Sequence, residues 1–210
     1  MIDPISRRQF ATLGTGLALG VPTIVMASAD DKPEPPKSPA QPVEASFERD
    51  YPEPGFKPSW KKPQLNRTMA ADFVIYAHSD LEMTQKLLDK EPALLNAAMD
   101  WGAGDWETAL GGASHMGRRD IVALLLDRGA RIDLFCAAML GQLDAVRSFL
   151  TFQPHLIDAK GPHGFSLHFH AQVGGKESEP VLEYLQSVKP VKLGPNPFLR
   201  EPKPPGNPAK

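Results

Sequence analysis

Two segments of this chain end in nearly the same six residues, PALLNA at 92–97 and PHLIDA at 154–159. Each follows a pair of large apolar residues, Leu87–Leu88 before the first copy and Phe149–Leu150 before the second. Internal self-similarity is typical of repeat proteins, in which each unit buries its apolar face against a neighbouring unit. The central part of the chain is therefore expected to be a stack of similar helical units.

The best-formed unit begins at Thr108, which starts a first helix. The small pair Ala113–Ser114 permits close contact between helices, and Gly117 makes the turn that follows. Residues 121–125 supply the apolar stripe of a second helix. Gly129 ends that helix, because glycine adopts a left-handed conformation at little cost. This order predicts a helix, a glycine turn and a second helix.

Taken from Trp101 to Asp133, the unit resembles an ankyrin repeat over its whole length. It departs from the family at Ala109 and Gly111, where the family has proline and histidine. Tetratricopeptide and HEAT repeats are rival structures, but neither explains the glycine turn together with the terminal Gly-Ala pair. The resemblance implies an all-α fold, a short ankyrin-repeat solenoid that serves as a binding scaffold through its hairpin fingers and the concave face of its first helices.

Three further units extend the array to four, at 71–97, 137–159 and 164–185. Gly141 follows Gly117 by only 24 residues, whereas the ankyrin period is about 33 residues. The unit that contains Gly141 is therefore expected to keep both helices and to have lost its hairpin finger. The last unit carries a few extra residues before its second helix.

Prolines concentrate on both sides of this array, at 33–63 and 190–208, where little apolar surface is available to bury. The aromatic residues between Phe47 and Trp60 either cover the first unit or hold a partner. The sequence thus divides into a signal peptide (1–29), a Pro-rich linker or collar (30–66), the repeat domain (67–190) and a disordered Pro-rich tail (191–210).

The N-terminus has the layout of an export signal. Arg7 and Arg8 stand before Phe10 and a moderately apolar stretch, and small residues at 27–29 are typical of a cleavage site after Ala29. The pattern resembles a twin-arginine signal, which implies a periplasmic or other extracytoplasmic location in a bacterium. An uncleaved membrane anchor is the alternative, because residues 10–29 approach the length of about 20 residues that spans a bilayer.

Composition excludes some classes of partner. The formal net charge is −2 and no long run of like charge occurs, so the basic footprint of a nucleic-acid binder is missing. Cys136 is the only cysteine and cannot form an intramolecular disulfide. We expect a monomer with no catalytic residue and no cofactor that binds a protein partner of unknown identity, and that meets the membrane during export or through an uncleaved anchor.

The repeat register places several aromatic, histidine and methionine side chains on or near the concave and finger side, and His78 falls on the same side. Such side chains are frequent anchors of recognition surfaces. An alternative is that the two tryptophans pack as core. The residues predicted to bind the partner are Trp101, Trp106, Glu107, His115, Met116, Met139 and His170.

A rival hypothesis is a periplasmic metal-binding or enzymatic protein that uses His163, His168 and His170, which lie within eight residues. If Ser166 opens a helix, His168 and His170 point about 200° apart and cannot both face one metal. The segment 164–168 only approximates a serine nucleophile elbow, which needs a glycine where His168 stands. We therefore expect no metal site, and Ser166 is assigned as a helix N-cap.

Overall fold

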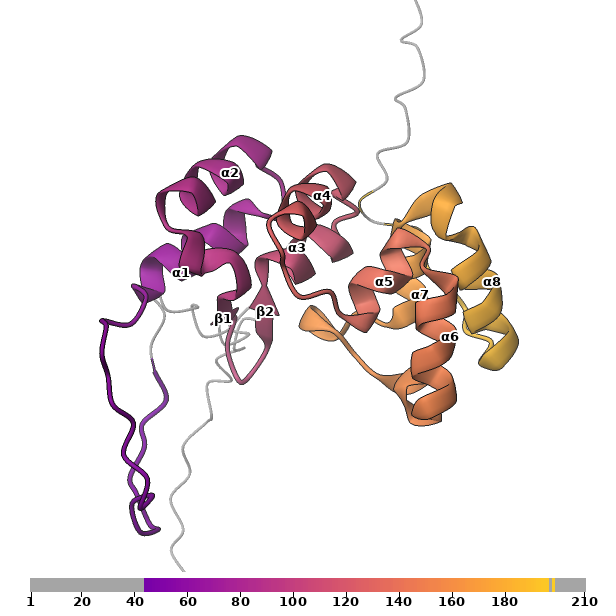
Figure 1. Ribbon diagram of the computed structural model, residues 1–210. Coiled ribbons are helices and arrows are strands. Elements are labelled where there is room, and N and C mark those ends of the chain that lie inside the picture. Colours follow the sequence, from indigo (N-terminus) through magenta and orange to yellow (C-terminus); the bar gives the residue numbers. More distant parts are fainter. Residues whose placement is uncertain (1–43, 197, 199–210) are drawn as a thin grey trace, which may run out of the picture. The chain divides into compact units, whose positions relative to one another are not determined.

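The computed structural model describes residues 44–196 and Phe198 (Figure 1). This part of the chain is mostly helical, as expected of an all-α fold, apart from one two-stranded sheet and one isolated bridge. The helices are α1 (Arg67–Tyr76), α2 (Leu81–Lys90), α3 (Ala109–His115), α4 (Arg119–Asp127), α5 (Leu134–Leu140), α6 (Leu143–Phe152), α7 (Leu167–Val173) and α8 (Glu179–Val188). Strands β1 (Ala98–Asp100) and β2 (Trp106–Thr108) pair antiparallel, with Met99 opposite Glu107.

The helices pack in consecutive pairs, α1 with α2, α3 with α4, α5 with α6, and α7 with α8. The first helices of the pairs form a row in which α1 contacts α3, α3 contacts α5, and α5 contacts α7. Among the second helices, α2 packs beside α4 and α6 beside α8. Four helix pairs therefore occupy the positions expected of the four units.

Local chemistry places the helix boundaries where the sequence predicts them. Thr108 caps α3, since its hydroxyl accepts a hydrogen bond from the Gly111 amide. Ser166 caps α7 in the same way and accepts from the Phe169 amide. Gly117 and Gly129 follow α3 and α4 with φ of +68° and +89°, the left-handed conformation that these turns require.

The two copies of the repeated six-residue segment adopt the same structure. Each forms a 3₁₀ helix, η1 (Pro92–Asn96) after α2 and η2 (Pro154–Asp158) after α6. Further 3₁₀ turns are η3 (Pro162–Gly164) and η4 (Gly175–Ser178). The extra residues expected in the last unit form η4, which lies between α7 and α8.

The units differ in the loops that precede their first helices. The second unit has a hairpin, here called finger A (98–108), which contains β1 and β2. The fourth unit has a shorter one, finger B (159–166), closed by an antiparallel bridge between Lys160 and Ser166. The third unit enters α5 directly from 130–133 without a strand, so the prediction that it lacks a finger is confirmed.

Apolar side chains gather in two cores. One lies among α1, α2, α3 and α4 and includes the fully buried Phe73 and Leu125, together with Cys136 and Met139 from α5. The other lies among α5, α6, α7 and α8 and includes Leu167 and Leu185.

The flanks are described only in part. Leu65 packs against the first core, whereas the Phe56 and Trp60 side chains are exposed. After Pro190 the chain still contacts the helices, because the Gln172 side chain donates a hydrogen bond to the Gly194 carbonyl and Phe198 packs near Phe165.

The signal at 1–29, with Arg7, Arg8 and the cleavage site at Ala29, lies outside the described residues. None of the helices in the described ranges has the length and apolar character that crossing a membrane requires.

Leu125→Ala tests the packing of the helix pairs. Leu125 is fully buried in the first core, so the truncation should lower the free energy of unfolding by about 2 to 5 kcal/mol. Ile132→Ala is the matched control, because Ile132 is exposed and its truncation should change stability by only about 0.5 kcal/mol. Urea unfolding followed by circular dichroism measures both, and equal effects would contradict the packing described.

Candidate metal centre

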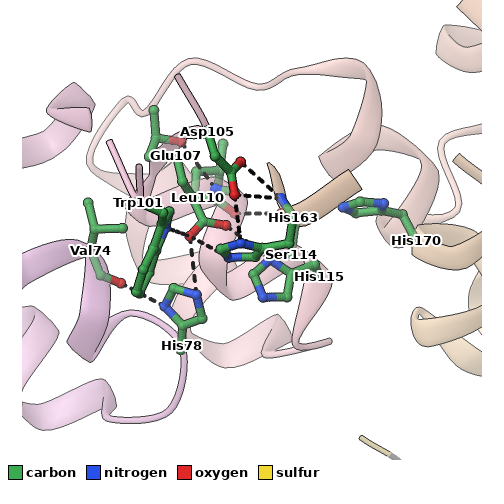
Figure 2. Close-up of polar contacts among 12 residues, drawn as sticks. Val74, His78, Trp101, Asp105, Glu107, Leu110, Ser114, His115, His163 and His170 are labelled. Atoms are coloured by element: carbon green, nitrogen blue, oxygen red, sulfur yellow. Dashed lines mark hydrogen bonds and ion pairs between the residues drawn. The ribbon is translucent and has the colours of Figure 1, made fainter. Parts of the chain in front are cut away.

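Four side chains with metal-binding atoms converge between α1, finger A, α3 and finger B (Figure 2). They are His78, Glu107, His115 and His163, and one donor atom of each lies within 4.8 Å of the donors of the others. They come from the first, second and fourth units, so the stacking of the units creates the cluster.

Glu107 is the centre of the cluster. It lies on β2 with its carboxylate buried. Its Oε2 accepts a hydrogen bond of 2.7 Å from Nε1 of Trp101 in the same finger. Burial alone would raise the pKa of the Glu107 carboxyl, but the His115 and His78 rings facing it lower that pKa to about 2. The carboxylate is therefore ionised at neutral pH and attracts cations.

His78 lies in the turn between α1 and α2. Its Nδ1 donates to the Val74 carbonyl at 2.8 Å, which directs Nε2 toward Glu107 Oε2 at 3.2 Å. Burial lowers the pKa of His78, but the Glu107 carboxylate outweighs it and the net pKa is raised. Gly112 provides the space, because a Cβ there would lie 2.6 Å from the His78 ring.

His163 lies at the tip of finger B in a left-handed conformation, with φ of +57°. Such a conformation is uncommon for a residue with a side chain and persists where the surroundings impose it. Asp105 of finger A holds it, because the Asp105 carboxylate accepts from the backbone amide of His163 at 3.0 Å and from its Nδ1 at 2.9 Å. The Nε2 atom of His163 then lies 3.4 Å from Glu107 Oε2.

His115 is the last residue of α3 and is buried. Its Nδ1 lies 3.0 Å from Glu107 Oε1, yet the pair lacks hydrogen-bond geometry. Both atoms are buried without a hydrogen-bond partner. A buried polar atom without a hydrogen bond costs about 1 to 3 kcal/mol, so this contact depends either on a protonated His115, which makes it an ion pair, or on a cation bound between the two atoms.

These distances bring four donors close to the spacing that a small cation needs. Around a tetrahedral Zn²⁺ with bonds of about 2.0 to 2.2 Å, neighbouring donor atoms lie about 3.3 to 3.6 Å apart. His78 and His163 lie 3.2 and 3.4 Å from Glu107 Oε2, and His115 lies 3.0 Å from Oε1. All four donor atoms lie within 4.8 Å of one another. The hydrogen bonds from His163 to Asp105 and from His78 to Val74 match the outer partners that orient metal-ligating histidines.

The structure places the predicted partner-binding residues in two groups. Trp106 is exposed, Trp101 is exposed in part although its indole nitrogen binds Glu107, and Met116 is half-buried. The other four are interior side chains that a partner cannot touch in this structure, which corrects the predicted surface. Glu107 and His115 belong to the cluster, and Met139 and His170 pack in the interior.

The histidine trio of the rival hypothesis does not assemble. His163 joins the cluster, but His168 Nε2 donates to the Lys189 carbonyl and His170 Nδ1 donates to the Ser166 carbonyl. His168 and His170 thus serve different contacts of α7, as the helical register predicts. Ser166 caps α7, as predicted.

Sequence reasoning missed His78 and Asp105 as site residues and assigned no metal to Glu107 or His115. One signal was present. Gly111 stands where the ankyrin pattern has histidine, and with Gly112 it leaves room beside α3 that the Glu107 and His78 side chains enter.

His170 gives a pH-dependent prediction. Burial lowers its pKa to about 4, below the 6.5 of an exposed histidine. As the pH falls, His170 therefore takes up a proton in the unfolded chain before it does so in the folded chain. The free energy of unfolding decreases as the pH falls from 6.5 towards 4. Between pH 7 and pH 5 the wild type should lose about 2 kcal/mol more than His170→Gln. Urea unfolding at both pH values measures this difference, and equal losses would show that His170 titrates normally.

No protein-family model, curated protein or solved structure matches this chain.

Proposed function

We propose that this protein binds one divalent first-row transition metal, with Zn²⁺ as the first candidate, through His78, Glu107, His115 and His163. The observation that carries the proposal is the buried pair of Glu107 Oε1 and His115 Nδ1, 3.0 Å apart and without hydrogen bonds, inside a cluster of four donors. A cation bound to both atoms would satisfy both.

Protonation supports the same conclusion. His78 and His163 each carry a proton on Nδ1, because these atoms donate to Val74 and to Asp105. Nε2 of each ring therefore faces the Glu107 carboxylate and is the atom through which that ring can ligate a metal. A dication there would bind these nitrogens and the carboxylate together.

The donor set suits zinc, copper or iron, which imidazole binds well, and one carboxylate completes it. Thiolate takes no part, since Cys136 lies in the first core and burial raises its pKa to about 11. Four protein donors fill a tetrahedral shell, as in structural zinc sites. The proposal therefore includes no catalytic step, and the metal would join the first, second and fourth units.

Metal binding can be tested on the full chain, purified without a histidine tag and stripped with a chelator. We expect titration calorimetry at neutral pH to show one Zn²⁺ per chain. His115→Ala should abolish stoichiometric binding, and Asp105→Asn, which removes only the outer partner of His163, should weaken it about 10- to 100-fold.

His155→Ala is the matched control, because His155 is exposed and lies outside the cluster. A folded full chain that takes up no zinc, copper or iron would overturn the proposal. Equal weakening by His155→Ala and His115→Ala would assign the binding to surface histidines.

We also propose that the helix pairs form an ankyrin-type solenoid that binds a protein partner. The order of cap, glycine turn and second helix in the unit from Thr108 supports the resemblance to ankyrin repeats. The exposed Trp106 and Phe149, which line the same groove, support a partner surface. The predicted export signal at Arg7 and Arg8 supports a location outside the cytoplasm for this activity.

Export is tested by replacing Arg7 and Arg8 together with lysine. Lysine keeps the charge but lacks the planar donor fork of the guanidinium group. The precursor should therefore stay in the cytoplasm, which fractionation followed by immunoblotting would detect. Continued export in this variant, or in a strain without the twin-arginine translocase, would show that another route reads the signal.

A further inference from the structure

A groove lies where the third unit lacks its finger. It has a volume of about 530 Å³ and runs between finger A and finger B over the start of α5. Residues 104–106 and Thr108 of finger A form one wall, and residues 159–162 of finger B form the other. Two hairpins thus flank the place that a third hairpin would fill in a complete row.

The backbone of finger A offers a free strand edge to this groove. Trp101 N–H donates to the Asp105 carbonyl at 2.9 Å, so these two residues form a hydrogen-bonded pair. Pairs alternate along an antiparallel ladder, and residues of the intervening pairs turn their N–H and C=O groups away from the partner strand. Trp106 pairs with Asp100, and Thr108 pairs with Ala98. Both are intervening pairs, so the backbone groups of Trp106 and Thr108 point away from β1. Trp106 N–H turns back to Gly104, which leaves the Trp106 carbonyl and the Thr108 N–H at the edge.

Finger B presents an equivalent edge. Gly161 N–H donates to the Phe165 carbonyl at 2.8 Å, and Lys160 is the bridge partner of Ser166. By the same alternation, the Lys160 backbone N–H and C=O point away from Ser166. Lys160 lines the groove, as do Trp106 and Thr108.

Side chains make the groove apolar. Trp106 and Phe149 line it with exposed fractions of 63% and 47%, and Phe135, Leu134 and Leu156 complete the surface. Large exposed apolar side chains beside a free strand edge are the features that peptide recognition by strand addition uses, with main-chain bonds for affinity and pockets for alternate side chains.

We propose that this groove binds an extended segment of a partner protein as an added strand between finger A and finger B, in place of the finger that the third unit lacks. The segment pairs with Thr108 and Lys160 through its main chain and places aromatic or large aliphatic side chains against Trp106 and Phe149. The volume holds about three or four residues, within the usual range of binding pockets. This inference concerns a surface other than the metal centre and does not rest on it.

The chain's own flanks fit this role poorly. Residues 33–63 and 190–208 hold most of the prolines, and proline has no N–H to give to a strand pair. A partner segment with alternating apolar residues and few prolines matches both the backbone edges and the aromatic wall.

The test is selection of a displayed random heptapeptide library on the full chain, with depletion on the Trp106→Ala and Phe149→Ala double variant. We expect enriched peptides with aromatic or large aliphatic residues at alternate positions. Synthetic copies should bind the wild type about 30-fold more tightly than they bind Trp106→Ala, the loss typical of a central anchor.

Two controls separate strand addition from simple apolar binding. Phe152→Ala should bind normally, because Phe152 is exposed but does not line the groove. A peptide N-methylated at its central residue keeps its side chains but loses an N–H donor, and it should bind at least about 10-fold more weakly.

Failure to enrich any peptide, or equal binding of the N-methylated peptide, would overturn the proposal. A wild-type dimer that Trp106→Ala converts to monomer would assign the groove to a second copy of the chain and would also overturn it. The selection is run once with zinc and once with chelator. Peptide binding in both conditions would depend on the groove alone, so failure of the metal proposal and failure of the groove proposal can be distinguished.

Discussion

The arrangement of the units depends on the contacts of one buried group, the carboxylate of Glu107. It accepts a hydrogen bond from Trp101 in its own finger and faces His78, His115 and His163 from three directions. An unpaired buried charge is costly, so these groups stabilise the carboxylate only while the helix pairs keep their positions. One ionised side chain thereby joins segments from both cores.

The missing finger of the third unit connects the candidate metal centre with the groove. Finger B reaches back to finger A, and His163 meets Asp105 across 58 residues of sequence. A hairpin in the third unit would occupy the space between them. Its absence leaves two strand edges facing the groove and also brings the third histidine of the cluster, His163, to Glu107. Loss of one structural element thus accounts for both features.

The predicted partner surface and the observed cluster share residues for a physical reason. The position of a residue within the repeat determines the direction in which its side chain leaves the helix or strand. This position predicted that His78, Glu107 and His115 lie on one side of the units, where the structure has them. The position within the repeat does not predict which other segments pack against that side. Glycines at 111 and 112 permit the close approach of Glu107 and His78, and finger B covers the same side. The side chains were therefore interior groups and could not serve as a recognition surface.

The sequence by itself determined the helix pairs, their caps, the left-handed glycine turns, the paired 3₁₀ segments and the absence of one finger. These features depend on residues within one or two turns of each other, where periodicity and backbone preference act directly. Only the tertiary structure decided that Glu107 is buried, that His163 leaves its neighbours His168 and His170 to join it, and that Trp106 stays exposed. Those outcomes depend on side-chain packing between units tens of residues apart, which no local pattern in the chain encodes.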